Sequence, residues 1–166
     1  MQNLMFRGGI IAAAIVVLSA CASSPDGLRP IRDAAPEPEL SPQDVVEIQL
    51  QAFGNNTEQD EGIEIAFRFA SPTNRAQTGP LPRFANMLRG PAYRVMLEHD
   101  RAEYAPLEMR DDLAIQRVAL YLDDEVTVFD FVLRRQMEEP YLDCWMTEAV
   151  FLRGSGTSDG SDSTVL

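Results

Sequence analysis

Two carboxylates of this chain stand inside apolar stretches, where their chemistry would differ from that of surface acids. Asp130 and Glu148 both alternate with apolar residues. These neighbours are Val126, Val128 and Val132 for the first acid, and Cys144, Met146, Val150 and Leu152 for the second. Burial in a medium of low dielectric constant raises the pKa of a carboxyl group, and such an acid is suited to proton transfer. Asp130 and Glu148 are therefore candidate catalytic acids.

Three further polar residues could complete a site with these acids. Gln49 projects from the middle of an apolar helical arc, and Tyr93 and His99 precede the first expected strand. Asp130 and His99 would serve as acid and base in an isomerase or dehydratase, whereas Gln49 and Tyr93 are candidate ligand-binding residues. Structural alternatives remain open for several of them. Gln49 would satisfy a buried backbone group, and His99 would be solvated at a strand start. Asp130 would face solvent or a dimer partner, and Glu148 would pair with an arginine.

Other familiar chemistries find no residues to support them. Ser71 precedes a proline and lacks the glycines that a strained nucleophile turn needs. The sequence contains no phosphate-binding loop, metal-ligand helix or calcium loop. A single histidine and two cysteines argue against a structural zinc site, which uses four such ligands. We therefore expect no cofactor and no metal.

A different chemistry, covalent acylation, is indicated at Cys21. Arg7 precedes a short apolar run from Gly8 to Val17, and Leu18-Ser19-Ala20-Cys21 follows. This order resembles a bacterial lipobox, in which residues 1–20 are removed as a signal peptide and Cys21 is diacylated. The residue after Cys21 is not aspartate, and in this respect the chain resembles lipoproteins that are sorted to the outer membrane. We expect a lipid-anchored envelope protein on the periplasmic face; the alternatives are an incidental cysteine in a secreted protein or an uncleaved anchor.

Composition limits the partners of the chain. The net charge is -12, and all 14 basic residues are arginines. Phosphate backbones and anionic head groups repel such a chain, so nucleic-acid binding and polybasic membrane docking are disfavoured. Once Cys21 is acylated, Cys144 has no disulfide partner, and we interpret it as a small buried apolar residue rather than a reactive thiol.

Composition also divides the chain into segments. Residues 21–40 are rich in proline and acidic residues and are predicted to form a disordered tether. Residues 41–153 are large enough for one core and form the predicted domain. Residues 154–166 are rich in glycine, serine and aspartate and are predicted to be a disordered tail.

Hydrophobic periodicity predicts an α+β domain. Ser41 and Pro42 favour a helix start, and three helices are expected over 42–54, 58–69 and 81–88. From Val95 onward the period changes to two, and four strands are expected over 101–109, 113–121, 126–135 and 142–152. Short turns between the strands imply antiparallel pairing, with the helices packed on one face of the sheet.

Several runs of the domain together are distinctive. They are Phe67 to Arg75, Thr78 to Leu81, Pro91 to Tyr93, and Pro140 to Met146. With these runs the chain resembles an uncharacterised family, the domain of unknown function 4864, over about Val45 to Leu152. That family is similar to the cone-shaped α+β class of nuclear transport factor 2, steroid isomerase and scytalone dehydratase. The resemblance implies a curved four-stranded sheet that forms a cone, but it carries no catalytic residues, because this class hosts enzymes and binding modules alike.

Three functions follow as hypotheses. The first is a non-catalytic binding or assembly module, the second a carrier that holds a small apolar ligand in the cone, and the third an isomerase or dehydratase. The strand from Val126 to Arg135 is apolar on both faces, so we also expect a homodimer or partner complex through the sheet face that the helices leave uncovered. An enclosed cavity that Asp130 and His99 enter would favour the enzyme, an apolar cavity without them the carrier, and a plugged cone with a broad apolar patch the binding or assembly module.

Overall fold

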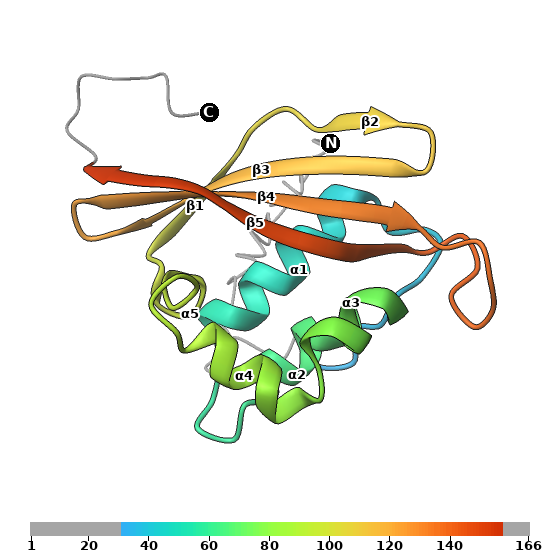
Figure 1. The fold of residues 1–166 in the computed structure, drawn as a ribbon, viewed down its shortest axis with the longest axis horizontal. Coiled ribbons are helices and arrows are strands. Elements are labelled where there is room, and N and C mark those ends of the chain that lie inside the picture. The colour runs from blue at the N-terminus through green and yellow to red at the C-terminus, as the bar shows by residue number, and fades with distance from the viewer. Residues whose placement is uncertain (1–30, 158–166) are drawn as a thin grey trace, which may run out of the picture.

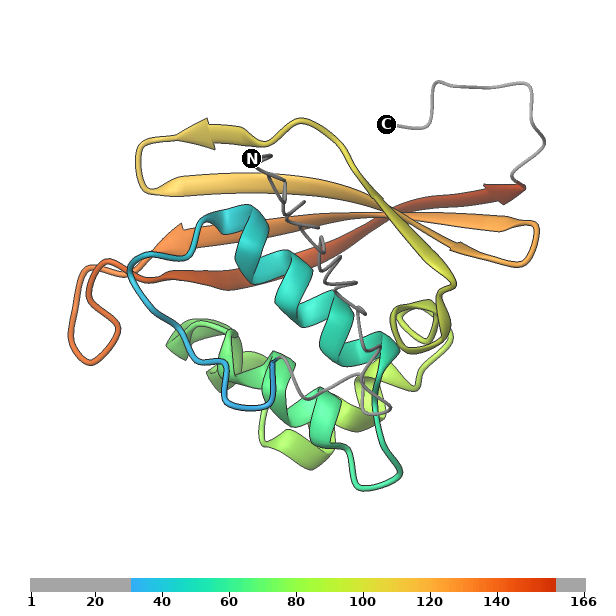
Figure 2. The ribbon, with the colours of Figure 1, turned by 180° about the vertical axis from the view of Figure 1, so that it is seen from behind.

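The computed structural model describes residues 31–157. Cys21, the expected signal peptide and residues 158–166 lie outside the described residues. The α+β class is confirmed, because the helices come first along the chain and lie together on one side of a mainly antiparallel sheet (Figures 1 and 2). Within residues 31–157, no helix is long and apolar enough to cross a membrane.

The described part of the chain contains five helices, not the three predicted. They are α1 (Pro42–Gly54), α2 (Glu61–Arg68), α3 (Pro72–Thr78), α4 (Leu81–Leu88) and α5 (Val95–Glu98). Helix α1 begins as predicted: the Asp44 backbone N–H donates to Oγ of Ser41, and the Asp44 carboxylate accepts from the Ser41 backbone N–H in return. This reciprocal cap satisfies two backbone donors that the first turn of a helix leaves unpaired.

The two unpredicted helices have separate causes. Ser71 and Pro72, which we interpreted as the end of a helix, begin α3, because the Asn74 backbone N–H donates to Oγ of Ser71 at 3.0 Å. Helix α5 is a single turn in the run from Val95 that alternation assigned to extended chain. Over so few residues, periodicity does not separate a strand from a buried helical turn.

The sheet has five strands within the described residues, not four. They are β1 (Arg101–Tyr104), β2 (Glu108–Arg110), β3 (Leu113–Leu122), β4 (Glu125–Arg135) and β5 (Trp145–Thr157), in the order β1-β3-β4-β5 with β2 also paired to β3. The strand predicted over 101–109 is divided into β1 and β2. The gap contains Pro106, whose backbone cannot donate to a ladder hydrogen bond.

Described elements of the structure extend beyond both predicted domain boundaries. Residues 154–157 were assigned to a disordered tail, yet they continue β5 and pair with residues 125–128 of β4. Ladder hydrogen bonds come from the backbone, so a strand forms here even though glycine and serine offer little side-chain packing.

Part of the predicted tether also belongs to the domain. Ile31 is 6% exposed and joins the core, and Nη1 of Arg68 donates to the backbone carbonyl of Arg32 at 2.8 Å. The composition of this segment is polar overall, but Ile31 and the half-buried Ala34 supply apolar contacts that hold residues 31–40 against α2. Residues from Ile31 onward therefore pack with the domain.

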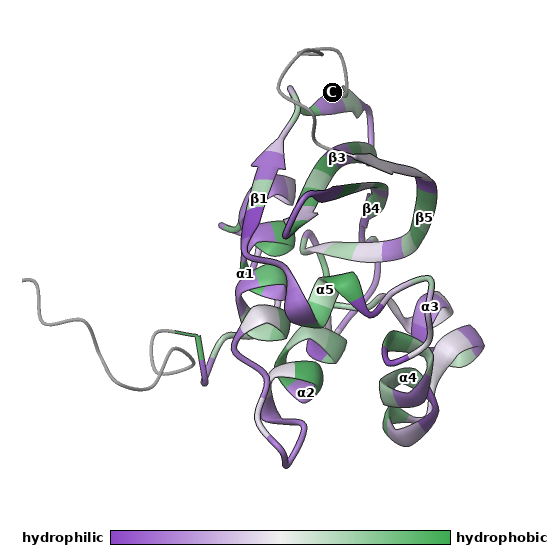
Figure 3. Ribbon diagram, turned by 90° about the vertical axis from the view of Figure 1, so that its left-hand side faces the viewer, coloured by the Kyte–Doolittle hydropathy of each residue, from purple (hydrophilic) through white to green (hydrophobic). Residues whose placement is uncertain are grey.

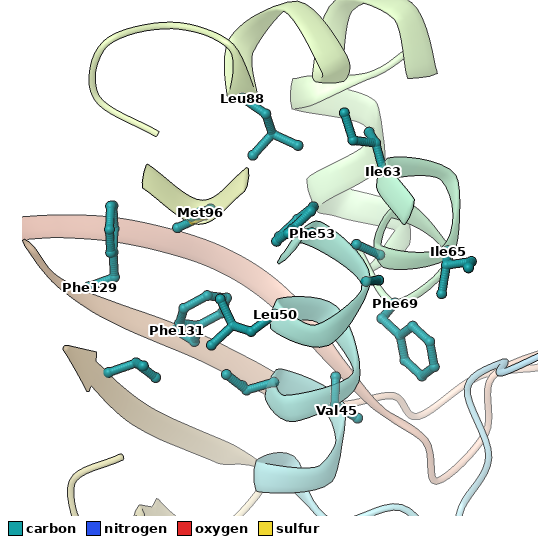
Figure 4. Close-up of a cluster of buried hydrophobic side chains, with 14 of the residues drawn as sticks. Val45, Leu50, Phe53, Ile63, Ile65, Phe69, Leu88, Met96, Phe129 and Phe131 are labelled. Carbon is teal, nitrogen blue, oxygen red and sulfur yellow. The ribbon is translucent and has the colours of Figure 1, made fainter. Parts of the chain in front are cut away.

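The core lies between the sheet and the helices. Phe129 and Phe131 of β4 face Leu50 and Phe53 of α1, and Leu88 of α4 closes the cluster from the far side (Figure 4). Figure 3 shows the two layers from the side, with hydrophobic and hydrophilic residues interleaved along the strands. The sheet thus presents one apolar face to the helices.

The opposite face of the sheet, which we call the back face, carries a smaller cluster. Ala119, Val126 and Val128 are buried there beside Tyr121. Phe151 of β5 pairs with Asp130 on this face and is 54% exposed. Strand β4 is therefore apolar on both faces, as predicted, while self-association through the back face stays a prediction.

Candidate functional site

A pocket of about 190 Å³ lies between the sheet and the helices. Its lining comes from α1, α3, α4, α5, Tyr93 and strands β4 and β5. The apolar lining residues are Phe53, Ala70, Phe84, Met87, Leu88, Met96, Phe131, Ala149 and Val150. The polar ones are Gln49, Asn74, Gln77, Thr78, Tyr93, Thr147 and Glu148. Three of the five candidates from the sequence, Gln49, Tyr93 and Glu148, therefore meet in one place.

Thr147 fixes one wall of this pocket through three of its polar groups. Its backbone N–H donates to the Phe69 carbonyl at 2.8 Å, and its own carbonyl accepts from the Ser71 N–H at 2.9 Å and from Nδ2 of Asn74 at 3.0 Å. Its hydroxyl donates to Oε1 of Gln49 at 2.7 Å. The junction of α2 and α3 is thereby tied to the outer edge of β5.

Gln49 has a structural role in addition to its place in the pocket lining. The residue is 4% exposed, and its Nε2 donates to the Ala66 carbonyl at 3.0 Å. That carbonyl belongs to the last turn of α2, so Gln49 links α1, α2 and β5. The structural interpretation of Gln49 is confirmed, and its polar atoms are already engaged within the protein.

Tyr93 lines the pocket and also packs against the core. Its ring stacks on Phe129 with centroids 6.0 Å apart, and its hydroxyl donates to the Val150 carbonyl at 3.4 Å. The hydroxyl reaches the backbone of β5 next to the segment that carries Glu148. Tyr93 therefore holds the loop after α4 against the edge of the sheet.

Glu148 occupies an irregular position in β5. Thr147 is the partner of Leu133 and Ala149 is the partner of Val132, so Glu148 is an extra residue between two consecutive pairs. Such a bulge bends the strand and re-aims the side chain that it inserts. Glu148 lines the pocket as a result, and within residues 31–157 its carboxylate has no hydrogen-bond or ion-pair partner.

The bulge also shows that regular alternation, by which we placed Cys144, Met146, Val150 and Leu152 on one face with Glu148, is wrong for the last strand. Alternation places Trp145 and Phe151 on the same face, but Trp145 packs in the main core and Phe151 lies on the back face. One extra residue reverses the parity of all positions beyond it, because side chains in a strand alternate with a period of two.

Asp130 lies on the back face, away from the pocket. It is 8% exposed, and its carboxylate accepts from Nε of Arg117 at 2.8 Å and pairs with Nε of Arg153 at 3.2 Å. The hydrogen bond to Asp130 raises the pKa of the Arg117 guanidinium. Asp130 is buried among valines as expected, but its carboxyl group is paired with two arginines and is not isolated.

A shallow groove of about 400 Å³ runs beside these ion pairs. It is lined by Arg117, Val126, Val128, Arg153 and residues 154–157. The two guanidiniums on its rim already share one carboxylate, so the groove holds a charge network and not an acid ready for proton transfer. The main pocket is the better candidate site because it is lined by both layers of the fold.

His99 stands outside the pocket as well. It follows α5, its Nδ1 lies 2.9 Å from the Met96 carbonyl, and its ring packs near Gly54 at the end of α1. Asp130 and His99 therefore do not form the acid–base pair that we considered. Cys144 is buried, and burial raises the pKa of its thiol, which agrees with its interpretation as a small apolar residue.

Sequence reasoning missed the contribution of α3 to the site. Asn74 and Thr78 line the pocket and are hydrogen-bonded to each other, with Oγ1 of Thr78 donating to the Asn74 carbonyl at 2.9 Å. The signal was present, because Ser71-Pro72 repeats the arrangement of Ser41-Pro42 that marked α1. No local signal points to Thr147, whose role depends on a partner 98 residues away.

Comparison with protein families decides the relationship of the chain. One family model, the domain of unknown function DUF4864, matches residues 37–158. The chain belongs to the DUF4864 family. All residues that line the pocket fall within the DUF4864 match, as do both bulges of β5. Comparisons with curated proteins and with solved structures find no match.

Proposed function

We propose that this protein is a non-catalytic carrier, a binding module that holds one small, mainly apolar molecule in the pocket. The observation that carries the proposal is the lining of that pocket. Most of it is apolar, and its buried amides and hydroxyls are hydrogen-bonded within the protein. A cavity of about 150 Å³ with apolar walls is known to hold a molecule the size of benzene, so this pocket suits a single small ring or short chain.

The positions of the acids support binding over catalysis. Within the described residues, Glu148 is the single ionisable carboxylate of the pocket lining. Proton transfer usually pairs a base with an acid across the substrate. Asp130 is held by two arginines on the other face of the sheet. His99 directly follows the last residue of α5 and does not line the pocket. An isomerase or dehydratase reaction would have to proceed without either of them.

We also propose that the fold is similar to that of the nuclear transport factor 2 class. An antiparallel sheet with helices on one face and a pocket between the layers supports it. The extra short strand β2 and helices α3 and α5 are the differences that a structural comparison with that class would have to accommodate.

Benzyl alcohol is a suitable probe for the pocket. We expect it to produce saturable NMR shift changes at Leu88 and Val150 in the full chain held in detergent micelles, with empty micelles as the blank. Met87→Trp should abolish these changes because it fills the pocket from α4. The matched control is Met137→Trp, at a 71% exposed position outside the pocket lining, which should bind as wild type does. A wild-type protein without saturable shifts, or equal binding by both variants, would refute the proposal.

We further propose that the module is anchored through Cys21 on the periplasmic face of the outer membrane. The support is the lipobox-like sequence, which lies outside the described residues. Cells fed a palmitate analogue should label the wild-type protein and not Cys21→Ala, which should remain uncleaved or become soluble. Cys144→Ala removes the other cysteine and should leave labelling unchanged. An unlabelled wild-type protein in the soluble fraction would contradict the anchor.

A further inference from the structure

We propose that the pocket is selective for a small organic cation, with the ammonium group at Glu148 and the hydrocarbon body against the apolar lining. This inference rests on the proposed binding function and specifies the ligand class. It starts from the one charged group of the pocket. Within residues 31–157 Glu148 has no hydrogen-bond or ion-pair partner, although the domain pairs several other acids with arginines.

The hydrogen-bonding inventory of the pocket points to the same class. Of the six neutral polar lining residues, Gln49, Asn74, Thr78, Thr147 and Tyr93 each donate a hydrogen bond inside the protein, and the sixth, Gln77, is exposed to solvent. An ionised carboxylate only accepts hydrogen bonds. The pocket thus offers an unused acceptor with a negative charge, which complements a cationic donor and repels an anionic ligand.

The backbone geometry shows that this charge is placed by the fold and not by regular alternation. Glu148 and Arg153 are the two charged residues of β5, and each is the extra residue at one of its two register shifts. The second bulge brings Arg153 to Asp130 on the back face. The first bulge places Glu148 in the pocket lining, next to the hydrogen-bonded Thr147. Both bulges of β5 therefore set the position of a charged side chain.

The surroundings of Glu148 suit a cation with an apolar body. Phe84, Phe131 and Tyr93 provide aromatic rings, and Met87 and Met96 provide polarisable thioethers. Aromatic rings and sulfur atoms favour contact with cations and with methyl or methylene groups. The net charge of -12 raises the local concentration of cations around the whole chain. A bare metal ion fits less well, because the described residues contain no group of three or more metal-ligating side chains.

Benzylamine and benzyl alcohol test the inference, because they differ in charge and match in size. In titrations of the full chain in neutral detergent micelles near pH 7, we expect benzylamine to bind about tenfold more tightly than the alcohol, as one charge-assisted hydrogen bond would give. Glu148→Gln keeps the shape and removes the charge, so it should reduce that ratio to about two or less. Glu58→Gln changes the net charge equally at an exposed position outside the pocket lining and should keep the wild-type ratio.

Each outcome of this experiment separates the two proposals. Equal affinities of wild type for the amine and the alcohol would overturn the cation inference and leave the binding function intact. A preference for the amine that survives in Glu148→Gln would also overturn it. If neither probe binds wild type, the proposed function itself fails.

Discussion

Replacing Gly62 with alanine is expected to destabilise the domain by about 3 kcal/mol or more, because overpacking against rigid backbone cannot be relieved by a side-chain rotation. A Cβ atom at this position would lie 2.1 Å from the Ala52 carbonyl oxygen and 2.9 Å from Cα of Asn56. Both atoms belong to the backbone around the end of α1, so the clash must separate α1 from α2. Urea unfolding followed by Trp145 fluorescence would measure the loss.

Two other glycines provide the control for this prediction. A Cβ added at Gly154 or Gly156 in β5 would meet nothing within 4 Å. Alanine at either position is expected to change the free energy of unfolding by less than about 1 kcal/mol. Any change should be towards higher stability, because alanine restricts the unfolded chain more than glycine does. Equal losses at positions 62 and 154 would show that the close approach of α1 and α2 is not the cause.

Phe131→Ala should have the second large effect, a loss of about 3–5 kcal/mol in the free energy of unfolding. Phe131 is 1% exposed, packs in the main core and also lines the pocket. Removing the ring therefore joins a new cavity to the existing one. Phe131→Leu fills much of the lost volume and should lose clearly less, as thermal or urea unfolding would show.

The enlarged pocket gives this prediction a second readout. Benzene should raise the melting temperature of Phe131→Ala more than that of wild type or of Phe131→Leu, because it refills the vacated volume. A loss of stability below about 1 kcal/mol in Phe131→Ala would contradict the packing of β4 against α1.

Local sequence signals predicted much of the fold because they act over a few residues. The cap at Ser41 and the apolar stripe of α1 are readable in this way, and so is the alternation of β3 and β4. The same Ser-Pro signal at position 71 was interpreted as a helix end because it directly followed another helix. A capping residue only states that a helix can begin, and its meaning depends on the chain that follows.

The site was harder to predict because it depends on register. Alternation correctly placed Asp130 on the face of the valines, but it could not supply Arg117 and Arg153, which come from neighbouring strands. Alternation also assigned Glu148 to a regular strand, whereas the structure has a bulge at this position that places Glu148 in the pocket lining. Bulges are set by how two strands pair, and one strand read alone carries little sign of them.

If the proposed anchor at Cys21 is present, the burial of Ile31 limits the distance between the pocket and the membrane. Ile31 is part of the core, so an anchor at Cys21 is joined to the folded domain by residues 22–30 alone. Nine residues span at most about 30 Å even when fully extended, which is roughly the thickness of the hydrocarbon layer itself. Anchored in this way, the domain would operate as a short-range receptor that samples molecules at the lipid surface and could not reach across the compartment to a distant partner.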